Sequence, residues 1–359
     1  MDSVNKDISK AATLPSEFYT DKKYLEISKD SLFAKTWQLI CDDSKLKILN
    51  DAYPFYFLES YIDEPLLYIH SSDNVIQCFS NVCTHRGNLL VEHPCQINRD
   101  ITCKYHGRRF NVCGKFISMP ETDGMKNFPL TQDDLTEVPT IKWKQFLFTS
   151  LDPSYELSVF LKDMDDRVGW MPIENFIFDS KRSRDYLVEA NWALYCDNYL
   201  EGFHIPFVHK DLAKTLDYSQ YNSEIFPFSN LQLGIASGSD YCFDLPKDSV
   251  DYGKEVAAYY YWVFPNMMFN FYPWGLSLNI VKPLNSKLTK VEFRTYIWDE
   301  SKLDIGAGSI LDKVEREDEY IVENVQKGVS SRFYKKGRFS PKMEKGVHHF
   351  HRLISDFIG

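Results

Sequence analysis

The sequence predicts an α+β protein in two parts, because short strands dominate the first part and long strands alternate with helices in the second. Between Trp37 and about residue 150, short apolar runs alternate with turn residues, which is typical of a small all-β domain. A chain of 359 residues is long enough for two domains. The runs expected to be strands include LLYIH (66–70), NVIQCFS (74–80) and FLFTSL (146–151).

Helices are expected mainly after residue 151. Two segments carry helix start and stop signals: 191–202, with Asn191 as N-cap, and 309–328, ending at Gly328. The expected strands of this part are DYLVEA (185–190) and long aromatic runs within 230–300. A further short helix is expected within 22–36.

The composition is that of a globular protein, with 44% hydrophobic and 26% charged residues. A formal net charge of −10 argues against nucleic acid and anionic membranes as main partners. No apolar run reaches the ~18 residues of a membrane span, and the N-terminus lacks the apolar core of a signal peptide. We therefore expect a cytoplasmic protein that binds neither nucleic acid nor membrane.

Two short loops carry one cysteine and one histidine each, Cys83-x-His85 and Cys103-x-x-His106. Two cysteines and two histidines also suit tetrahedral zinc, but zinc fingers usually pair like with like. One of each per loop favours a Rieske [2Fe–2S] centre, in which one iron takes two thiolates and the other takes two imidazoles. Glycines that follow each histidine, Gly87 and Gly107, allow tight turns over the cluster.

The remaining cysteines do not extend this pattern. Clustered cysteines in a reducing compartment favour a metal over disulfides. Cys95 and Cys113 lie outside the ligand pattern, and we expect them to be ordinary buried or half-buried thiols.

A second pair of histidines lies in EGFHIPFVH, residues 201–209. His204 and His209 would point about 140° apart on a straight helix, but Gly202 and Pro206 can break it. Non-haem Fe(II) oxygenases hold iron with two histidines and one carboxylate. We therefore expect His204 and His209 to bind a mononuclear iron.

The third ligand is sought on the acidic helix 309–328. At about 100° per residue, Asp318 falls in the middle of the apolar stripe, where a carboxylate is costly unless it binds metal or is paired. Glu201 precedes His204 by one helical turn and is expected to orient it. The other acids of the helix are expected on a solvated face: Glu315, Glu317, Glu319 and Glu323.

Together these segments resemble the oxygenase (α) component of Rieske non-haem iron oxygenases. The matching landmarks are CTHRG…CKYHGRRF, NWALYCDNYLEGFHIPFVH and EDEYIVENVQKG, in that order. The resemblance implies a Rieske-type β domain at 37–150 and a helix-grip catalytic domain at 151–359, with the helical segment 1–36 packed on the latter. It departs from many relatives at Arg108, where they have Trp.

The family resemblance also implies an assembly and a source of electrons. In a head-to-tail homotrimer, His106 faces Glu201 across a subunit boundary, and Glu201 bridges the electron path to His204. This bridging acid is often Asp in relatives, and Asn198 nearby receives no role. DIGAGS, 304–309, is no nucleotide fingerprint, so the electrons must come from a separate NAD(P)H-dependent flavin/iron–sulfur reductase, with O₂ as oxidant.

DNYLEGFHIPFVHK and FPNMMFNFYPWGLSLNIVKPL are similar to the branch of choline monooxygenase and of betaine and carnitine oxygenases. That branch implies hydroxylation or N-demethylation of a small quaternary ammonium compound, which an aromatic cage can bind. A ring-hydroxylating dioxygenase acting on an aromatic or other hydrophobic ring is the alternative. The cage candidates, which can equally be core aromatics, are Phe203, Phe207, Tyr272 and Trp274.

Two other function classes make different predictions. A pure electron carrier would hold no iron at His204 and His209, and a zinc-stabilised binding module would be colourless. The histidines of GVHHFHRL, 346–353, are expected at a structural helix end or an interface rather than at a metal.

Overall fold

The computed structural model describes residues 2–73, 75–209, 223–236, 242–303 and 311–359. The chain divides into two compact units. The small unit is Ala34–Ser154, and the large unit combines Met1–Phe33 with Tyr155–Gly359. Both units contain antiparallel sheet, and helices pack on the sheet of the large unit, so the predicted α+β class is confirmed.

The strands of the small unit are β1 Gln38–Asp42, β2 Asp51–Phe57, β3 Glu64–Ser72, β4 Val75–Ser80, β5 Cys95–Gln96, β6 Ile101–Thr102, β7 Arg109–Phe110, β8 Phe116–Ser118, β9 Glu137–Val138, β10 Thr140–Trp143 and β11 Phe146–Thr149. They form sheets in the orders β1-β11-β10, β5-β2-β3-β4-β9 and β6-β7-β8 over the described residues. Three of them, β3, β4 and β11, are the strands predicted from apolar runs. Cys83 and Cys103 belong to the apolar core of this unit, beside Phe79 and Phe110.

The large unit is built on a seven-stranded antiparallel sheet, counted over the described residues, in the order β12-β18-β17-β16-β15-β14-β13. Neighbouring strands of this sheet are consecutive in sequence, with one exception. Strand β12 pairs with β18, so that Val188 lies opposite Thr289. The strands are β12 Ile177–Val188, β13 Ser223–Ile225, β14 Ser229–Ile235, β15 Val256–Val263, β16 Met267–Tyr272, β17 Gly275–Asn285 and β18 Leu288–Ile297.

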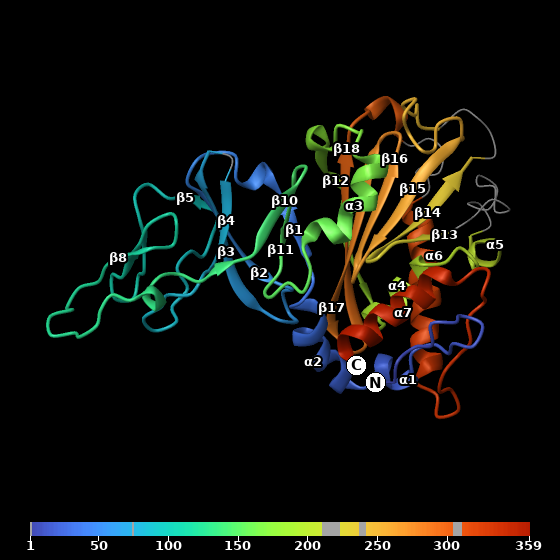
Figure 1. The fold of residues 1–359 in the computed structure, drawn as a ribbon, viewed down its shortest axis with the longest axis horizontal. Coiled ribbons are helices and arrows are strands. Elements are labelled where there is room, and N and C mark those ends of the chain that lie inside the picture. The colour runs from blue at the N-terminus through green and yellow to red at the C-terminus, as the bar shows by residue number, and fades with distance from the viewer. Residues whose placement is uncertain (1, 74, 210–222, 237–241, 304–310) are drawn as a thin grey trace. The chain divides into compact units, whose positions relative to one another are not determined.

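The helices of the large unit are α1 Ser16–Thr20, α2 Lys22–Ser28, α3 Leu157–Val168, α4 Trp192–Tyr199, α5 Ile205–Val208, α6 Leu311–Val329 and α7 Lys345–Ile358. Helix α3 lies on β14 and β15, whereas α4 packs against α6 and β17 (Figure 1). The predicted helix 22–36 is α2 followed by a π-helical turn at Lys29–Phe33.

Two predicted helix ends differ from the structure. The carboxamide of Asn191 caps α4 by accepting a hydrogen bond from the N–H of Ala193 (3.0 Å), as predicted, but α4 ends at Tyr199 rather than near Gly202. Helix α6 continues through Gly328 to Val329, because Gly328 does not adopt the left-handed backbone that would end it. Ser309, the predicted start, lies outside the described residues.

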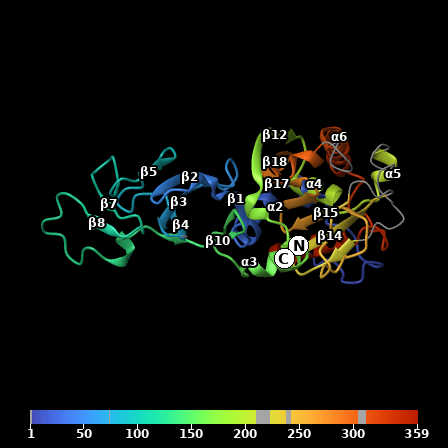
Figure 2. The same ribbon diagram turned by 90° about the horizontal axis from the view of Figure 1, so that it is seen from above.

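The histidines of α7 hold the N-terminal segment within the large unit. His351 Nδ1 accepts a hydrogen bond from the N–H of Leu14 (3.1 Å), and its Nε2 lies 2.8 Å from a carboxylate oxygen of Asp197. His348 Nε2 lies 2.8 Å from the carbonyl oxygen of Asn5. The two termini accordingly lie side by side (Figures 1 and 2). These contacts agree with the expected structural role of GVHHFHRL.

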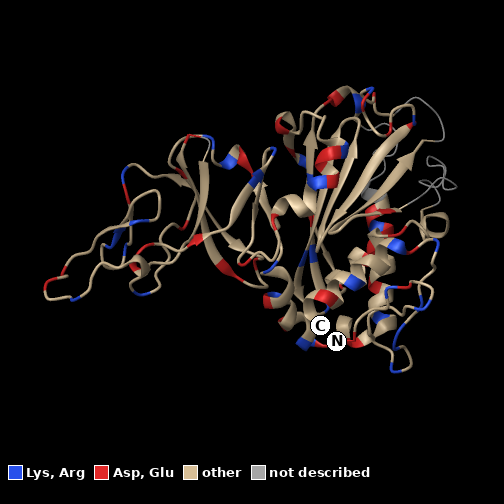
Figure 3. Ribbon diagram, in the orientation of Figure 1, with Lys and Arg blue, Asp and Glu red and all other residues tan. Residues whose placement is uncertain are grey.

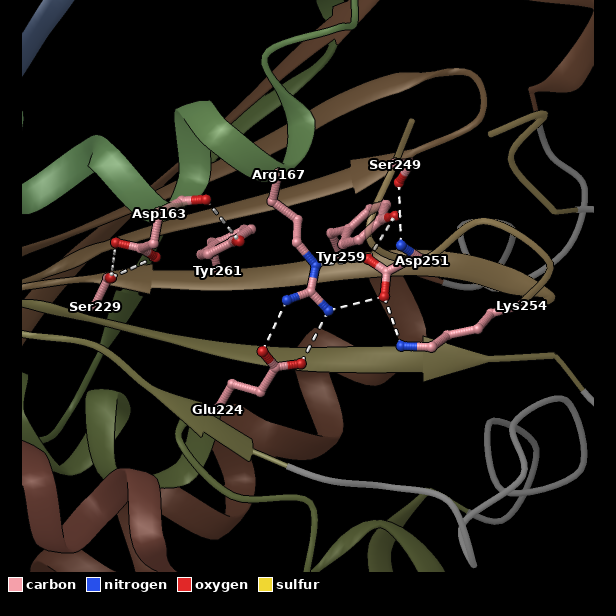
Figure 4. Close-up of polar contacts among 9 residues, drawn as sticks. All are labelled: Asp163, Arg167, Glu224, Ser229, Ser249, Asp251, Lys254, Tyr259 and Tyr261. Atoms are coloured by element: carbon pink, nitrogen blue, oxygen red, sulfur yellow. Dashed lines mark hydrogen bonds and ion pairs between the residues drawn. The ribbon is translucent and has the colours of Figure 1, made fainter. Parts of the chain in front are cut away.

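An ionic network lies at the β13 edge of the large sheet, around the buried side chains of Arg167 and Asp251 (Figure 4). Arg167 of α3 makes a bidentate pair with Glu224 of β13 (2.7 and 2.9 Å) and a second pair with Asp251 (2.5 Å), whose side chain is fully buried. Asp251 also accepts hydrogen bonds from Lys254 and Tyr259. Elsewhere acidic and basic residues are interspersed on both units (Figure 3). No helix among the described residues is long and apolar enough to cross a membrane.

Candidate functional site

The first candidate site lies in two loops of the small unit that share one backbone conformation. The N–H of Gly87 donates to the carbonyl of Cys83, and the N–H of Gly107 donates to that of Cys103, both at 3.0 Å. Each cysteine N–H in turn donates to a carbonyl five residues later, at 2.8 Å. Gly87 and Gly107 have φ of 70° and 71°, a left-handed conformation that favours glycine, as the sequence predicted.

These loops present two thiols and two imidazoles to one region. Cys83 and Cys103 are each only 2% exposed and lie next to one another, whereas the rings of His85 and His106 are exposed. The two ring centroids are 4.7 Å apart. A buried thiol pair beside an exposed imidazole pair fits a [2Fe–2S] cluster with unlike ligands on its two irons.

Cys95 and Cys113 are free thiols, as expected, but both are exposed rather than buried. Cys95 lies on the two-residue strand β5 at the edge of its sheet, and Cys113 lies in a turn after Asn111. Neither place offers a core to pack against, so the predicted burial was wrong.

The second candidate site joins α5 to α6 in the large unit. Donor atoms of His204, His209 and Asp318 all lie within 4.8 Å of one another. Nε2 of His209 is 3.0 Å and Nε2 of His204 is 3.5 Å from Oδ1 of Asp318. The histidines flank the single-turn helix α5, which contains Pro206. This short, interrupted helix allows two residues five apart to face one point.

A carboxylate contacts Nδ1 of each imidazole, whereas Nε2 faces Asp318. Oε1 of Glu201 is 2.7 Å from Nδ1 of His204, and Oε2 of Glu317 is 2.7 Å from Nδ1 of His209. With Nδ1 as the donor, each ring keeps an Nε2 lone pair toward Asp318, which is the arrangement that metal-binding histidines need. The other oxygen of Glu201 accepts hydrogen bonds from the N–H groups of Phe203 and His204.

Two acids of α6 were therefore misplaced by the sequence prediction of a solvated face. Glu317 contacts the buried ring of His209, whereas Glu323 makes an exposed hydrogen bond with the N–H of Glu189 (3.1 Å), which is compatible with a solvated face. The carboxyl of Glu315 accepts a hydrogen bond from the hydroxyl of Tyr195 (2.6 Å). Burial, followed by the charge of Asp318, raises the pKa of Glu315 to about 8.

Asn198, to which the sequence gave no role, donates a hydrogen bond to Oδ1 of Asp318 (2.6 Å). Its neighbour one turn earlier, Tyr195, contacts Glu315, one turn before Asp318. Residues three apart share a helix face, so α4 and α6 meet along two matched pairs. This matched spacing is present in the sequence, but it points to Asn198 and Glu315 only when α4 and α6 are known to pack together.

The donor set fits a mononuclear iron. Two imidazoles and one carboxylate form the set typical of non-haem Fe(II) sites with open coordination positions. Burial disfavours a charged ring at His209, but the carboxylates of Asp318 and Glu317 outweigh that effect and raise its pKa. The site is thus strongly cation-attracting.

Comparison with known proteins identifies the family. Residues 36–129 match the Rieske [2Fe-2S] domain, and residues 173–359 match the ring hydroxylating alpha subunit (catalytic domain). The chain belongs to the family of Rieske oxygenase α subunits. It is thus an O₂-dependent oxidoreductase that combines a Rieske [2Fe–2S] domain with a catalytic domain of the kind that binds mononuclear iron.

Curated relatives of this Rieske oxygenase extend over nearly its whole length. It is 30% identical to choline monooxygenase, chloroplastic, of Arabidopsis thaliana, covering 97% of this chain and 83% of that protein. It is 28% identical to the carnitine monooxygenase oxygenase subunit of Escherichia coli (strain K12), covering 96% and 93%. The predicted family and branch are confirmed by these relatives.

Solved structures show the same fold. A quaternary ammonium Rieske monooxygenase in complex with L-carnitine superposes with a TM-score of 0.78 at 23% identity, covering 100% of both chains. Naphthalene 1,2-dioxygenase with indole bound superposes with a TM-score of 0.72 at 16% identity, covering 100% of this chain and 95% of that one.

The four cage candidates form two ring pairs. Tyr272 and Trp274 are buried and stacked, with centroids 5.1 Å apart and planes at 10°. Phe203 and Phe207 are 43% and 74% exposed, with centroids 6.4 Å apart. The buried pair is joined by Tyr260, whose ring centroid is 6.0 Å from that of Tyr272.

Proposed function

We propose that this Rieske oxygenase hydroxylates or N-demethylates a small quaternary ammonium compound. One observation carries the proposal: relatives that match almost the entire chain at 28–30% identity are choline and carnitine monooxygenases. If the attacked carbon is an N-methyl, the hydroxylated product breaks down to formaldehyde and a tertiary amine.

The proposed ligands divide between the two units. Cys83, His85, Cys103 and His106 would hold the [2Fe–2S] cluster, and His204, His209 and Asp318 would hold the Fe(II). When bound, these groups supply single electrons and O₂ activation.

The residues around the iron ligands have positioning roles. Glu201 and Glu317 fix the two imidazoles by their Nδ1 atoms, and Asn198 fixes the carboxylate of Asp318. Locked ligands keep the coordination geometry of the site when substrate and O₂ enter.

The chemistry of the buried aromatic pair supports a cationic substrate. Burial raises the pKa of Tyr272, and the neighbouring Tyr260, Tyr199 and Glu315 raise it further. The faces of such rings attract a quaternary ammonium group through cation–π interaction. We propose that Tyr272, Trp274 and Tyr260 line the substrate site, with their ring faces toward the cation.

The proposed assembly is a homotrimer in which Glu201 links His106 of one subunit to His204 of the next. A separate NAD(P)H-dependent flavin/iron–sulfur reductase would supply the electrons. The described cysteines are all free thiols, which fits a reducing compartment such as the cytoplasm.

A single-turnover assay tests the proposed substrate class. The protein is reduced chemically, then mixed with O₂ and one compound at a time, and products are identified by mass spectrometry. The compounds are choline, glycine betaine and carnitine, each beside its neutral tert-butyl analogue, and several aromatic acids. Oxidised or demethylated product from a quaternary amine, but not from its neutral analogue, supports the proposal.

The same assay tests the alternative. The fold likeness to naphthalene 1,2-dioxygenase favours, as a second candidate, dioxygenation of an aromatic or other hydrophobic ring. Products from the aromatic acids alone would establish that function and would mean that Tyr272 and Trp274 are core residues.

A further inference from the structure

Arg108 is a buried cation directly after the second ligand loop. Its side chain is only 3% exposed. The guanidinium carbon lies 5.7, 4.7 and 5.6 Å from the ring centroids of Phe110, Phe116 and Phe128. Burying a charge is costly unless it is paired and hydrogen-bonded. An apolar side chain would fill such an aromatic pocket at less cost, so the presence of a charge requires a reason.

Asp133 pairs with this cation but does not fully compensate it. Nη2 of Arg108 lies 2.7 Å from Oδ1 and 3.1 Å from the carbonyl oxygen of Asp133. The N–H of Leu130, and then Arg108, lower the pKa of Asp133, so its carboxylate is ionised. Its side chain is 15% exposed, and water therefore screens the anion more than the cation. Nε of Arg108 is buried without a hydrogen-bond partner in the described part of the chain.

The pair contacts both loops that carry the proposed cluster ligands. The carbonyl of Arg108 accepts the N–H of Cys103 (2.8 Å). The carbonyl of Asp133 accepts the hydroxyl of Thr84 (2.8 Å), which lies between Cys83 and His85. The guanidinium of Arg108 is therefore held, through Asp133, beside the loop that contains Thr84, in a low-dielectric setting where electrostatic effects are large.

We propose that Arg108 raises the reduction potential of the Rieske cluster and that Asp133 partly offsets this effect. The inference rests on the proposed ligation by Cys83, His85, Cys103 and His106. Reduction adds one negative charge to the centre, and a buried cation nearby stabilises the reduced form. Arg108 is thus a tuning residue that acts on the centre through its field, and its substitution changes the driving force for electron transfer.

The test is a spectroelectrochemical titration of the cluster in the intact protein. Arg108→Gln removes the charge, Arg108→Lys keeps it, and Asp133→Asn removes the opposing charge. Arg109→Gln is the matched control, because Arg109 is the next residue, pairs with Asp100 and is 36% exposed. Visible and electron paramagnetic resonance spectra verify that each variant contains an intact cluster.

We expect Arg108→Gln to lower the potential clearly, Arg108→Lys to stay nearer the wild type, and Asp133→Asn to raise the potential. Arg109→Gln should shift it much less, since solvent screens that side chain. If Arg108→Gln and Arg108→Lys shifted the reduction potential equally, or if Asp133→Asn lowered it, the effect would come from packing rather than from charge, and the proposal would be overturned. If Arg108→Gln does not form an intact cluster, the Asp133→Asn variant alone decides. A higher reduction potential in that variant supports the proposal, and an unchanged or lower potential overturns it.

The cluster ligation and the tuning role of Arg108 are tested by different results. A wild-type protein without a Rieske spectrum contradicts the proposed cofactor ligation. A normal wild-type spectrum whose potential does not respond to Arg108→Gln contradicts only the tuning role.

Discussion

Glu317 and His209 form a 2.7 Å contact between a carboxylate oxygen and Nδ1, on the side of the imidazole that faces away from Asp318. His209 is 1% exposed, so this carboxylate fixes both the orientation and the tautomer of a buried ring. The proposed iron site therefore draws on two acidic residues adjacent in sequence, one proposed to bind the metal and one proposed to hold a ligand.

We expect Glu317→Ala to weaken Fe(II) binding about 10- to 100-fold, the usual cost of removing a residue that orients a metal ligand. Fe(II) titration of protein freed of mononuclear iron measures this, with the cluster spectrum as a check on folding. Glu323→Ala on the same helix is the control and should bind iron normally. Equal affinities in both variants would show that the contact does not support the site.

Glu201→Gln should separate metal binding from electron transfer. Gln retains a carbonyl oxygen that can accept from Nδ1 of His204, so mononuclear iron should remain. The family resemblance gives the charged acid the role of electron bridge, and we expect the oxidation of the reduced cluster to slow by about 10- to 100-fold. Stopped-flow absorbance with substrate and O₂ measures that rate. An unchanged rate would remove Glu201 from the electron path.

Glu315 gives the metal-free protein a defined pH dependence. Its pKa is about 8 in the folded chain against an ordinary 4.5, so the folded form retains a proton that the unfolded form releases. The free energy of unfolding should therefore fall as the pH rises from 4.5 to 8, by about 1.4 kcal/mol for each pKa unit at most. Glu315→Gln should remove this decline and be the more stable protein at pH 8 but not at pH 4.5. If the urea midpoints of the wild type and Glu315→Gln changed in parallel across that pH range, Glu315 would not be the source of the pH dependence.

Arg167→Met should destabilise the large unit by about 3–5 kcal/mol, because it leaves the buried carboxylate of Asp251 with insufficient compensation. Lys162→Met, on the same helix, breaks an exposed pair with Asp166 and should cost no more than about 0.5 kcal/mol. Thermal unfolding of the two variants compares them directly. Similar midpoints would mean that the network of Figure 4 contributes little to stability.

Sequence periodicity was sufficient to predict some residues of the cluster around His204 and His209, but not others. Asp318 could be singled out because a carboxylate in an apolar stripe needs a partner, and Glu201 because it lies one turn from His204. Glu317 was missed because periodicity identifies the face of α6 that meets the core, but not the edge that meets α5, which is distant in sequence. The spacing of Tyr195 and Asn198 against Glu315 and Asp318 became meaningful only once α4 and α6 were seen to pack together.

Local patterns also predicted strands better than their arrangement. The runs that form β3, β4 and β11 were evident, whereas the pairing of β12 with β18 joins segments about a hundred residues apart and has no local signal. Helix ends were less certain, since Gly328 stays helical where nothing forces a left-handed turn. The exposure of Cys95 followed from its edge position, which depends on the whole sheet.

The most direct test of the account is a single turnover of wild-type protein against Asp318→Ala, each with its cluster reduced, using the best quaternary amine from the panel. We expect the variant to keep the cluster spectrum, lose mononuclear iron and form no product, while the wild type forms oxidised or demethylated amine. Product at the wild-type yield from the variant, or full mononuclear iron in it, would contradict the assignment of His204, His209 and Asp318 as the oxygen-activating centre.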